Sequence, residues 1–136
     1  MPWDECKRDF IRKVALDPEK IHSLVEMAKK RLKFAKSIKV TEENASFVFD
    51  DYYEIIKELL IALMLKKEMR SKNHQCLFTF FAKEFTYDAE VNVIKQMNFL
   101  RNRLDYYGEP VEYAYFQENY KSFENIIDLL LKLIKK

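Results

Sequence analysis

The sequence predicts an all-α fold, an antiparallel up-down helical bundle with four long helices and two short ones. The chain of 136 residues contains one glycine, Gly108, and three prolines, too few for the turns of an all-β or doubly wound fold. Apolar residues recur at three- and four-residue spacing along most of the chain, which is typical of amphipathic helices. The 49% apolar and 34% charged residues indicate a soluble globule. The length predicts one domain over residues 1–136.

The first two helices are predicted from their starting residues. Asp4 is expected to cap a short helix over residues 4–15. Asp17 and Pro18 then form the pair of cap and first-turn proline that is typical of a helix start. The second helix carries a run of cations without an acid, which indicates either a solvated outer face or a surface for an anionic partner. The run consists of Lys29, Lys30, Arg31, Lys33, Lys36 and Lys39.

A long third helix is expected over residues 41–69 or 46–69. Its apolar side chains form one stripe in the first half and cover nearly the full circumference in the second half. Such a helix is either central in the molecule or borders another subunit. Because a bundle of this size would otherwise expose Ile61, Met64 or Leu65 in an apolar patch, the sequence predicts a homodimer.

The remaining helices are predicted from breaks and caps. Residues 71–73, Ser71 to Asn73, offer a polar break and a cap, after which residues 74–85 are expected to form a short helix. Thr86 or Asp88 is expected to cap the next helix, and Gly108 to end it in the left-handed conformation. Pro110 is expected to open the last helix, which continues to the end of the chain.

Charge, cysteine content and hydropathy exclude several classes of protein. The 24 cations and 22 anions leave a net charge of +2, too small to require nucleic acid as a partner. Cys6 and Cys76 are too few for a disulfide scaffold and lack metal-ligand spacing, so two free thiols in a reducing compartment are expected. The start of the chain has no signal-peptide core, and no apolar run approaches the length of a bilayer span. We therefore expect a cytoplasmic protein without membrane contact, metal or cofactor.

One predicted helix carries polar residues beside its apolar seam. Their spacing of three and four residues places them on one face. An ion pair between Arg101 and Asp105 on a solvated face is one interpretation. The other is a ligand site in which the guanidinium of Arg101 binds phosphate and Asp51 or Glu54 orients it. The polar residues are Asn98, Arg101, Asn102 and Asp105.

Five short segments carry a family resemblance. They are residues 27–35, rich in Ala and Lys, the Tyr-rich residues 51–53, the apolar residues 59–63, Lys-Asn-His at 72–74, and Leu-Arg-x-x-x-Asp-Tyr at 100–106. In this order they resemble the HEPN domain, the small helical bundle of higher eukaryotes and prokaryotes nucleotide-binding proteins, in its minimal stand-alone prokaryotic and archaeal form. The resemblance implies a HEPN-like core over about residues 17–136.

Many HEPN proteins are metal-independent ribonucleases in which an arginine and a histidine, four to six residues further on, meet across a dimer. The resemblance places Arg101 and Asn102 at the start of this motif, but Tyr106 stands where the histidine is expected. A tyrosine, with an ordinary pKa of about 10, is a poor general base at pH 7. Catalysis is therefore not favoured, and the candidates for it are Arg101, Asn102 and His74, the last as a replacement for the missing histidine.

The resemblance also implies a protein partner. HEPN proteins pair with minimal nucleotidyltransferases, often as toxin and antitoxin, and in some pairs the partner transfers a nucleotide to a tyrosine beside the motif. Tyr106 and Tyr107 occupy this neighbourhood. Tyr107 is expected on the apolar seam, so Tyr106 is the better acceptor, and the added negative charge would pair with Arg101.

The sequence thus predicts a dimeric HEPN-like binding module for a nucleotide, an RNA or a nucleotidyltransferase. A ribonuclease with a degenerate motif is the alternative, and a structural interaction protein without a small ligand is the second alternative. The expected ligand site consists of Asn98, Arg101, Asn102, Asp105 and Tyr106, with Asp51 and Glu54 from the long helix.

Overall fold

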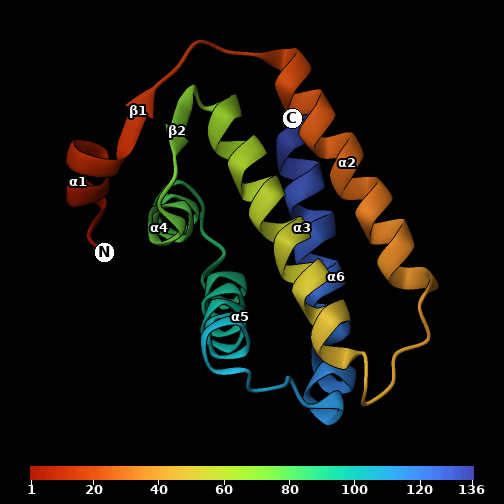
Figure 1. Cartoon of the computed structure of the whole chain (residues 1–136). Helices are drawn as coiled ribbons and strands as arrows, with labels where there is room; N and C mark the ends of the chain where they lie inside the picture. The colour runs from red at the N-terminus through yellow and green to blue at the C-terminus, as the bar shows by residue number, and fades with distance from the viewer.

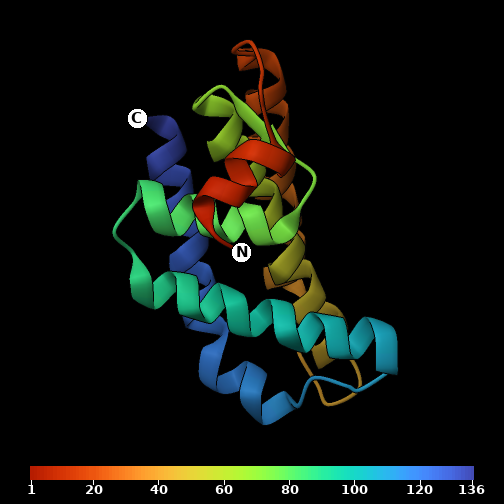
Figure 2. The same ribbon diagram turned by 90° about the vertical axis from the view of Figure 1, so that its left-hand side faces the viewer.

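The long helix α3 is the centre of the fold in this computed structural model, which describes residues 1–136 (Figure 1). α3 spans Ala45–Lys66, and 14 of its 22 residues are buried because its second half is apolar on nearly every side. α2 and α6 pack along it, while α4 and α5 cross it (Figure 2). These four helices are α2 (Pro18–Ser37), α4 (His74–Glu84), α5 (Asp88–Tyr107) and α6 (Tyr113–Lys135).

The predicted all-α helical bundle is confirmed, with four long helices and two short ones, α4 and α1 (Trp3–Glu5). α2 and α3 run in opposite directions, as expected for helices joined by a short loop. The crossing helices α4 and α5 return the chain to the starting end of α3, so α6 runs beside α3 in the same direction (Figure 1). None of the helices combines the length and the apolar composition needed to cross a membrane.

Three predicted helix ends are confirmed. At the start of α2, the Asp17 carboxylate accepts a hydrogen bond from the backbone N–H of Lys20 at 3.1 Å. At the start of α4, the Asn73 side chain accepts one from the backbone N–H of Cys76 at 3.2 Å. Gly108 ends α5 with a φ of +65°, a left-handed conformation in which a side chain would be strained.

The predicted cap of α5 is wrong. Tyr87 stands at the N-cap and makes no side-chain hydrogen bond there, so neither Thr86 nor Asp88 caps the helix. The Tyr87 ring instead stacks on Phe81 of α4, with 5.9 Å between the ring centroids. Aromatic packing between the two helices therefore fixes the start of α5 in place of a polar cap.

The predicted start of α6 is also wrong, because Pro110 lies outside the helix, which begins at Tyr113. Val111 is buried, and its backbone N–H donates a hydrogen bond to the Ser46 hydroxyl at 2.8 Å. This contact holds the segment before α6 against the start of α3. Packing of one apolar side chain thus outweighs the preference of proline for a first helical turn.

A pair of antiparallel strands replaces the ends of two predicted helices. The first helical segment, a short α-helix followed by a π-helical turn, ends at Phe10 rather than Ala15, and α3 ends at Lys66. Glu68 has a φ of +60°, which reverses the chain after α3, and its carbonyl accepts a hydrogen bond from the Val14 N–H at 3.0 Å. The strands are β1 (Ile11–Lys13) and β2 (Met69–Ser71), with Ile11 opposite Ser71.

Cys6 and Cys76 form a disulfide, with 5.6 Å between their Cα atoms, so the expectation of two free thiols is wrong. The strand pair and the contact of α1 with α4 bring the two residues together across 70 positions of sequence (Figure 2). In the chain-entropy description, a cross-link over such a loop stabilises the fold by about 4 kcal/mol. Because disulfides persist mainly in oxidising compartments, the cysteines do not support a cytoplasmic location, which stays a prediction.

The second half of α3 is covered by the chain itself. Met64 and Leu65 are 1% and 5% exposed, and Ile61 is half-buried. β2 and α4 contact α3 and contribute to this cover. The expectation that these three residues form an exposed patch is therefore wrong. The homodimer stays a prediction without it.

Candidate functional site

The side chain of Arg101 forms ion pairs between α5 and α3. It is 23% exposed and lies over the ring of Tyr53, with its Cζ atom 5.3 Å from the ring centroid. Three carboxylates surround the guanidinium, and together with Arg101 we call them the Arg101 cluster. The distances are 2.9 Å from Nε to Asp105 Oδ2, 3.1 Å from Nη2 to Glu54 Oε1 and 3.5 Å from Nε to Asp50 Oδ1.

The ring that supports the Arg101 cluster is itself fixed by a buried hydrogen bond. The Tyr53 hydroxyl donates to Asn98 Oδ1 at 2.9 Å. Burial raises the pKa of Tyr53 to about 12; the charge of Arg101 opposes this shift, and the neighbouring carboxylates add to it. The hydroxyl therefore remains a donor at pH 7. Asn98 is buried and serves this bond, which makes it part of the contact between α3 and α5.

The charges of the cluster do not favour an anionic ligand. Three carboxylates face only two cations. One cation is Arg101, and the other is Lys57, whose Nζ lies 2.7 Å from Glu54 Oε2. Burial raises the pKa of Asp50, and repulsion by Asp105 and Glu54 adds to this effect, although Arg101 opposes it. With every group ionised the cluster is net negative. The guanidinium that was expected to bind phosphate is therefore already engaged by carboxylates.

Two other residues of the expected ligand site lie outside these contacts. Asp51 faces Arg31 of α2 rather than Arg101, and burial raises the pKa of its carboxyl while Arg31 lowers it. Asn102 is half-buried and makes no side-chain hydrogen bond within the chain. Of the two carboxylates proposed to orient Arg101, the structure therefore brings Glu54 to it and not Asp51, whose neighbour Asp50 takes that place.

The two tyrosines at the end of α5 are both accessible. Tyr106 and Tyr107 are 78% and 70% exposed, so the expectation that Tyr107 lies covered on the apolar seam is wrong. The last turn of α5 extends beyond the other helices (Figure 2). There Arg103 lies over the Tyr107 ring, 4.9 Å from its centroid, and pairs with Glu109. Exposure does not distinguish the two tyrosines as acceptors.

His74 is the first residue of α4 and is partly buried. Burial, followed by the positive charges of Lys57 and Arg101, lowers the pKa of its imidazole. The neutral form therefore predominates at pH 7, where it can accept a proton. His74 makes no hydrogen bond or ion pair with Arg101, whose partners are the three carboxylates.

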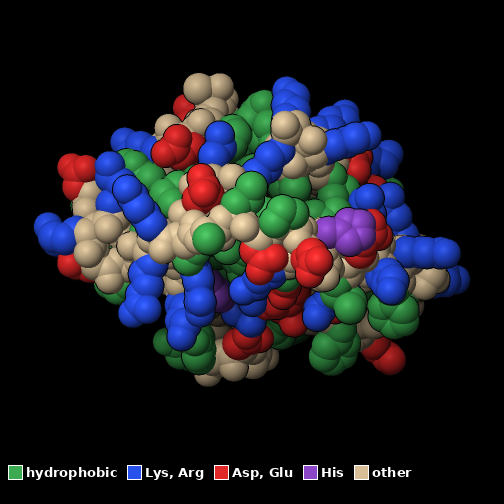
Figure 3. Space-filling model, turned by 90° about the horizontal axis from the view of Figure 1, so that it is seen from above, with side chains coloured by type: hydrophobic (Ala, Val, Ile, Leu, Met, Phe, Trp, Pro, Cys, Tyr) green, Lys and Arg blue, Asp and Glu red, His purple; other side chains and the backbone are tan.

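A cationic hollow of about 310 Å³ opens between the start of α2, the middle of α3, β2 and the start of α4. No carboxylate lies within 4 Å of Lys20, Arg70 or Lys72, all of which are exposed there. A second hollow of about 220 Å³ shares Arg70 and Lys72 and adds Arg12 and one acid, Asp9. Figure 3 looks onto this end of the molecule, where Lys and Arg side chains cover much of the surface. We call the larger hollow, of about 310 Å³, the basic hollow. Its ionisable lining residues are Lys20, Lys57, Arg70, Lys72, His74 and Glu58.

Glu54 connects the Arg101 cluster to the basic hollow. One of its oxygens accepts a hydrogen bond from Arg101 at 3.1 Å, and the other lies 2.7 Å from the Lys57 ammonium. Lys57 in turn lines the hollow. The cluster therefore fixes the position of one of the cations in the hollow while it holds α5 against α3.

Sequence reasoning identified His74 but missed the basic hollow. Lys20 and Arg70 are far apart in the chain, and no strand was expected at β2, where the predicted third helix ends at Met69 and a polar break follows. The available signal was the run of cations at Lys66, Lys67, Arg70 and Lys72, which has one acid among them. No protein-family model, curated protein or solved structure gives a significant match to the chain.

Proposed function

We propose that the protein is a HEPN-like helical binding module that holds phosphate groups of a nucleotide or an RNA in the basic hollow. The observation that carries the proposal is the set of three exposed cations without carboxylate partners, Lys20, Arg70 and Lys72, around one space. Phosphate oxygens form charge-assisted hydrogen bonds with such groups, and the counterions released from RNA add to the affinity. The HEPN assignment itself depends on the sequence motifs.

In this proposal Arg101 is a positioning residue and does not bind the phosphate. Its guanidinium is occupied by Asp50, Glu54 and Asp105. It holds Glu54, and Glu54 holds Lys57 at the hollow. The motif that suggested a ligand site is thereby connected to the hollow through one carboxylate.

A metal-independent ribonuclease is the second candidate, because the neutral imidazole of His74 lines the same hollow. His74 would accept the proton of a ribose 2′-hydroxyl. The 2′-oxygen would then bond to the adjacent phosphorus while the bond to the 5′-oxygen breaks, and water would protonate that leaving oxygen. Lys57 and Arg70 would stabilise the charge that develops on the phosphate.

The resemblance also supports a protein partner, either a second copy or a minimal nucleotidyltransferase in a toxin–antitoxin-like pair. We place this contact on α5, where the large side chains of Phe99, Tyr106 and Tyr107 are all exposed. Exposed aromatic residues are enriched in protein interfaces. In such a pair Tyr106 remains an accessible acceptor for a nucleotidyl group.

The test is binding of fluorescein-labelled single-stranded RNA, followed by anisotropy, to the wild type and to the double variant Arg70→Gln/Lys72→Gln. We expect about tenfold weaker binding by the variant, from the loss of two charged contacts. The control is Lys95→Gln/Lys121→Gln, which removes the same charge from exposed positions on α5 and α6 outside the hollow. Its affinity should equal that of the wild type.

Three other results separate the alternatives. Equal weakening by both double variants would show that the hollow is not the site. Failure of the wild type to bind RNA or nucleotide would favour a structural interaction protein. Cleavage of the RNA in the presence of a chelator, lost in His74→Gln, would establish the ribonuclease.

A further inference from the structure

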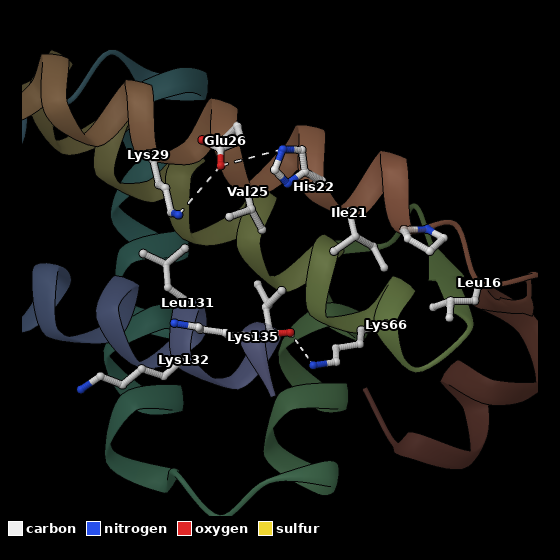
Figure 4. Close-up of a pocket in the computed structure, with 12 residues that line it drawn as sticks. Leu16, Ile21, His22, Val25, Glu26, Lys29, Lys66, Leu131, Lys132 and Lys135 are labelled. Atoms are coloured by element: carbon white, nitrogen blue, oxygen red, sulfur yellow. Dashed lines mark hydrogen bonds and ion pairs between the residues drawn. The ribbon is translucent and has the colours of Figure 1, made fainter.

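A groove of about 700 Å³ runs between α2 and α6 near the end of α6 (Figure 4). The two helices pack mainly on α3 rather than on each other, and the groove lies in the angle between them. Ile21 and Val25 of α2 face Leu131 of α6 across it, and Leu16 lies at one end. Ile134 of α6 also lines the groove. Neither the hollows nor the Arg101 cluster shares any of these residues.

Lysines surround this apolar groove. Its only carboxylate, Glu26, lies 4.0 Å from both Lys29 and His22, at the limit of an ion pair. Lys66 donates a hydrogen bond to the Ile134 carbonyl and thereby satisfies the last turn of α6. Lys132 and Lys135 have no carboxylate within 4 Å. The rim is therefore net positive around an apolar floor, which is complementary to an acidic amphipathic partner.

The shape of the groove favours a helix over an acyl chain. Its α2 wall runs from Pro18 to Lys29, about 17 Å or three helical turns at 1.5 Å per residue. Ile21 and Val25 are four residues apart and Leu131 and Ile134 are three apart, so each wall presents a ridge that a third helix can interdigitate with. The groove is open to solvent rather than enclosed, whereas a small apolar ligand needs a site that encloses most of its surface.

We infer that the groove between α2 and α6 is a docking site for an acidic amphipathic helix of a partner protein. Its apolar residues, at spacing i, i+3 or i+4, and i+7, insert between the two ridges. Its Asp and Glu side chains on either side of that stripe meet Lys29, Lys132 and Lys135. The docked helix forms a four-helix arrangement with α2, α3 and α6. The inference is independent of phosphate binding in the basic hollow.

The experiment uses two labelled peptides of about 15 residues, both helical and with the same Leu stripe, one with Glu and one with Lys beside the stripe. Anisotropy with the full chain should detect binding of the Glu peptide and not of the Lys peptide. The variant Lys132→Glu/Lys135→Glu should bind the Glu peptide at least about tenfold more weakly, since two attractive contacts become repulsive. The control Lys95→Glu/Lys121→Glu makes the same charge reversal away from the groove and should leave the affinity unchanged.

Methyl NMR locates the peptide. The Glu peptide should shift the methyl signals of Ile21, Val25, Leu131 and Ile134, and leave those of Val93 on α5 in place. Equal binding of the two peptides, equal weakening by the control variant, or methyl shifts outside the groove would each overturn the inference. Shifts at the same methyls with oleate, together with no binding of the Glu peptide, would assign the groove to an anionic lipid and overturn it as well.

Discussion

Replacement of Arg101 by glutamine tests whether the Arg101 cluster holds α5 against α3. The variant Arg101→Gln retains a polar side chain of similar length but removes the only cation that faces all three carboxylates. Asp50, Glu54 and Asp105 then repel one another in a partly buried space, with only Lys57 left to pair with Glu54. We expect a loss of stability and a new dependence on pH.

The magnitude follows from the burial of the charges. Removal of one partner from a fully buried ion pair costs about 3–5 kcal/mol. Arg101 is 23% exposed, and the side chains of Glu54 and Asp50 are 19% and 37% exposed, so solvent screening reduces the cost to about 2 kcal/mol. For a chain of this size that loss lowers the melting temperature by about 6 °C.

The assay is urea denaturation followed by circular dichroism at several pH values. The pKa of Asp50 is already raised by burial and by its acidic neighbours, and loss of Arg101 raises it further. A carboxyl with a higher pKa in the folded state binds more protons there than in the unfolded state, so the free energy of unfolding falls as the pH rises above about 4. The deficit of the variant should therefore shrink when the pH is lowered from 7 towards 4.

The control is Arg103→Gln, the same substitution on the same helix at an exposed ion pair with Glu109. Exposed pairs contribute little, so Arg103→Gln should retain nearly the full stability of the wild type. If both variants lost the same stability, or if the deficit of Arg101→Gln did not change with pH, the structural role assigned to the cluster would be refuted.

Three further predictions concern stability. Reduction of the Cys6–Cys76 disulfide should lower the free energy of unfolding by about 4 kcal/mol, measured by urea titration with and without dithiothreitol. A loss below about 1 kcal/mol would contradict the stabilising role of the disulfide. The variant Tyr53→Phe should lower the free energy of unfolding, measured by calorimetry, by about 1–2 kcal/mol, because the buried Asn98 oxygen loses its donor. An unchanged free energy of unfolding would mean that water replaces the hydroxyl. Burial and nearby cations lower the pKa of His74, so His74 resists protonation in the folded protein. The wild type should therefore lose more stability than His74→Gln as the pH falls through about 6.5. Parallel pH profiles of stability for the two proteins would argue against that environment.

Local signals predicted most of the helical fold. The caps Asp17 and Asn73 and the stop at Gly108 depend on contacts within a few residues, and the structure has all three. The elements that sequence missed depend on distant contacts. β1 forms a strand because Glu68 reverses the chain after α3 and presents β2 beside it, and no periodicity near residue 11 indicates that partner.

The candidate site was predicted in part for the same reason. The helical spacing of Arg101 and Asp105 indicated an ion pair within one helix, and the pair is present at 2.9 Å. The contact of Arg101 with Glu54 requires only that two long helices, α5 and α3, pack together, and it was also expected. The basic hollow joins α2, α3, β2 and α4, so its position depended on strands that the sequence pattern does not reveal.

The salt dependence of RNA binding is the sharpest test of phosphate binding in the basic hollow. Each phosphate contact of a single strand contributes about 0.7 to the slope of log Kd against log salt concentration. If Arg70 and Lys72 both contact phosphate in the basic hollow, the variant Arg70→Gln/Lys72→Gln should have a slope about 1.4 smaller than the wild type. An unchanged slope in this variant, with binding retained, would contradict phosphate binding in the basic hollow.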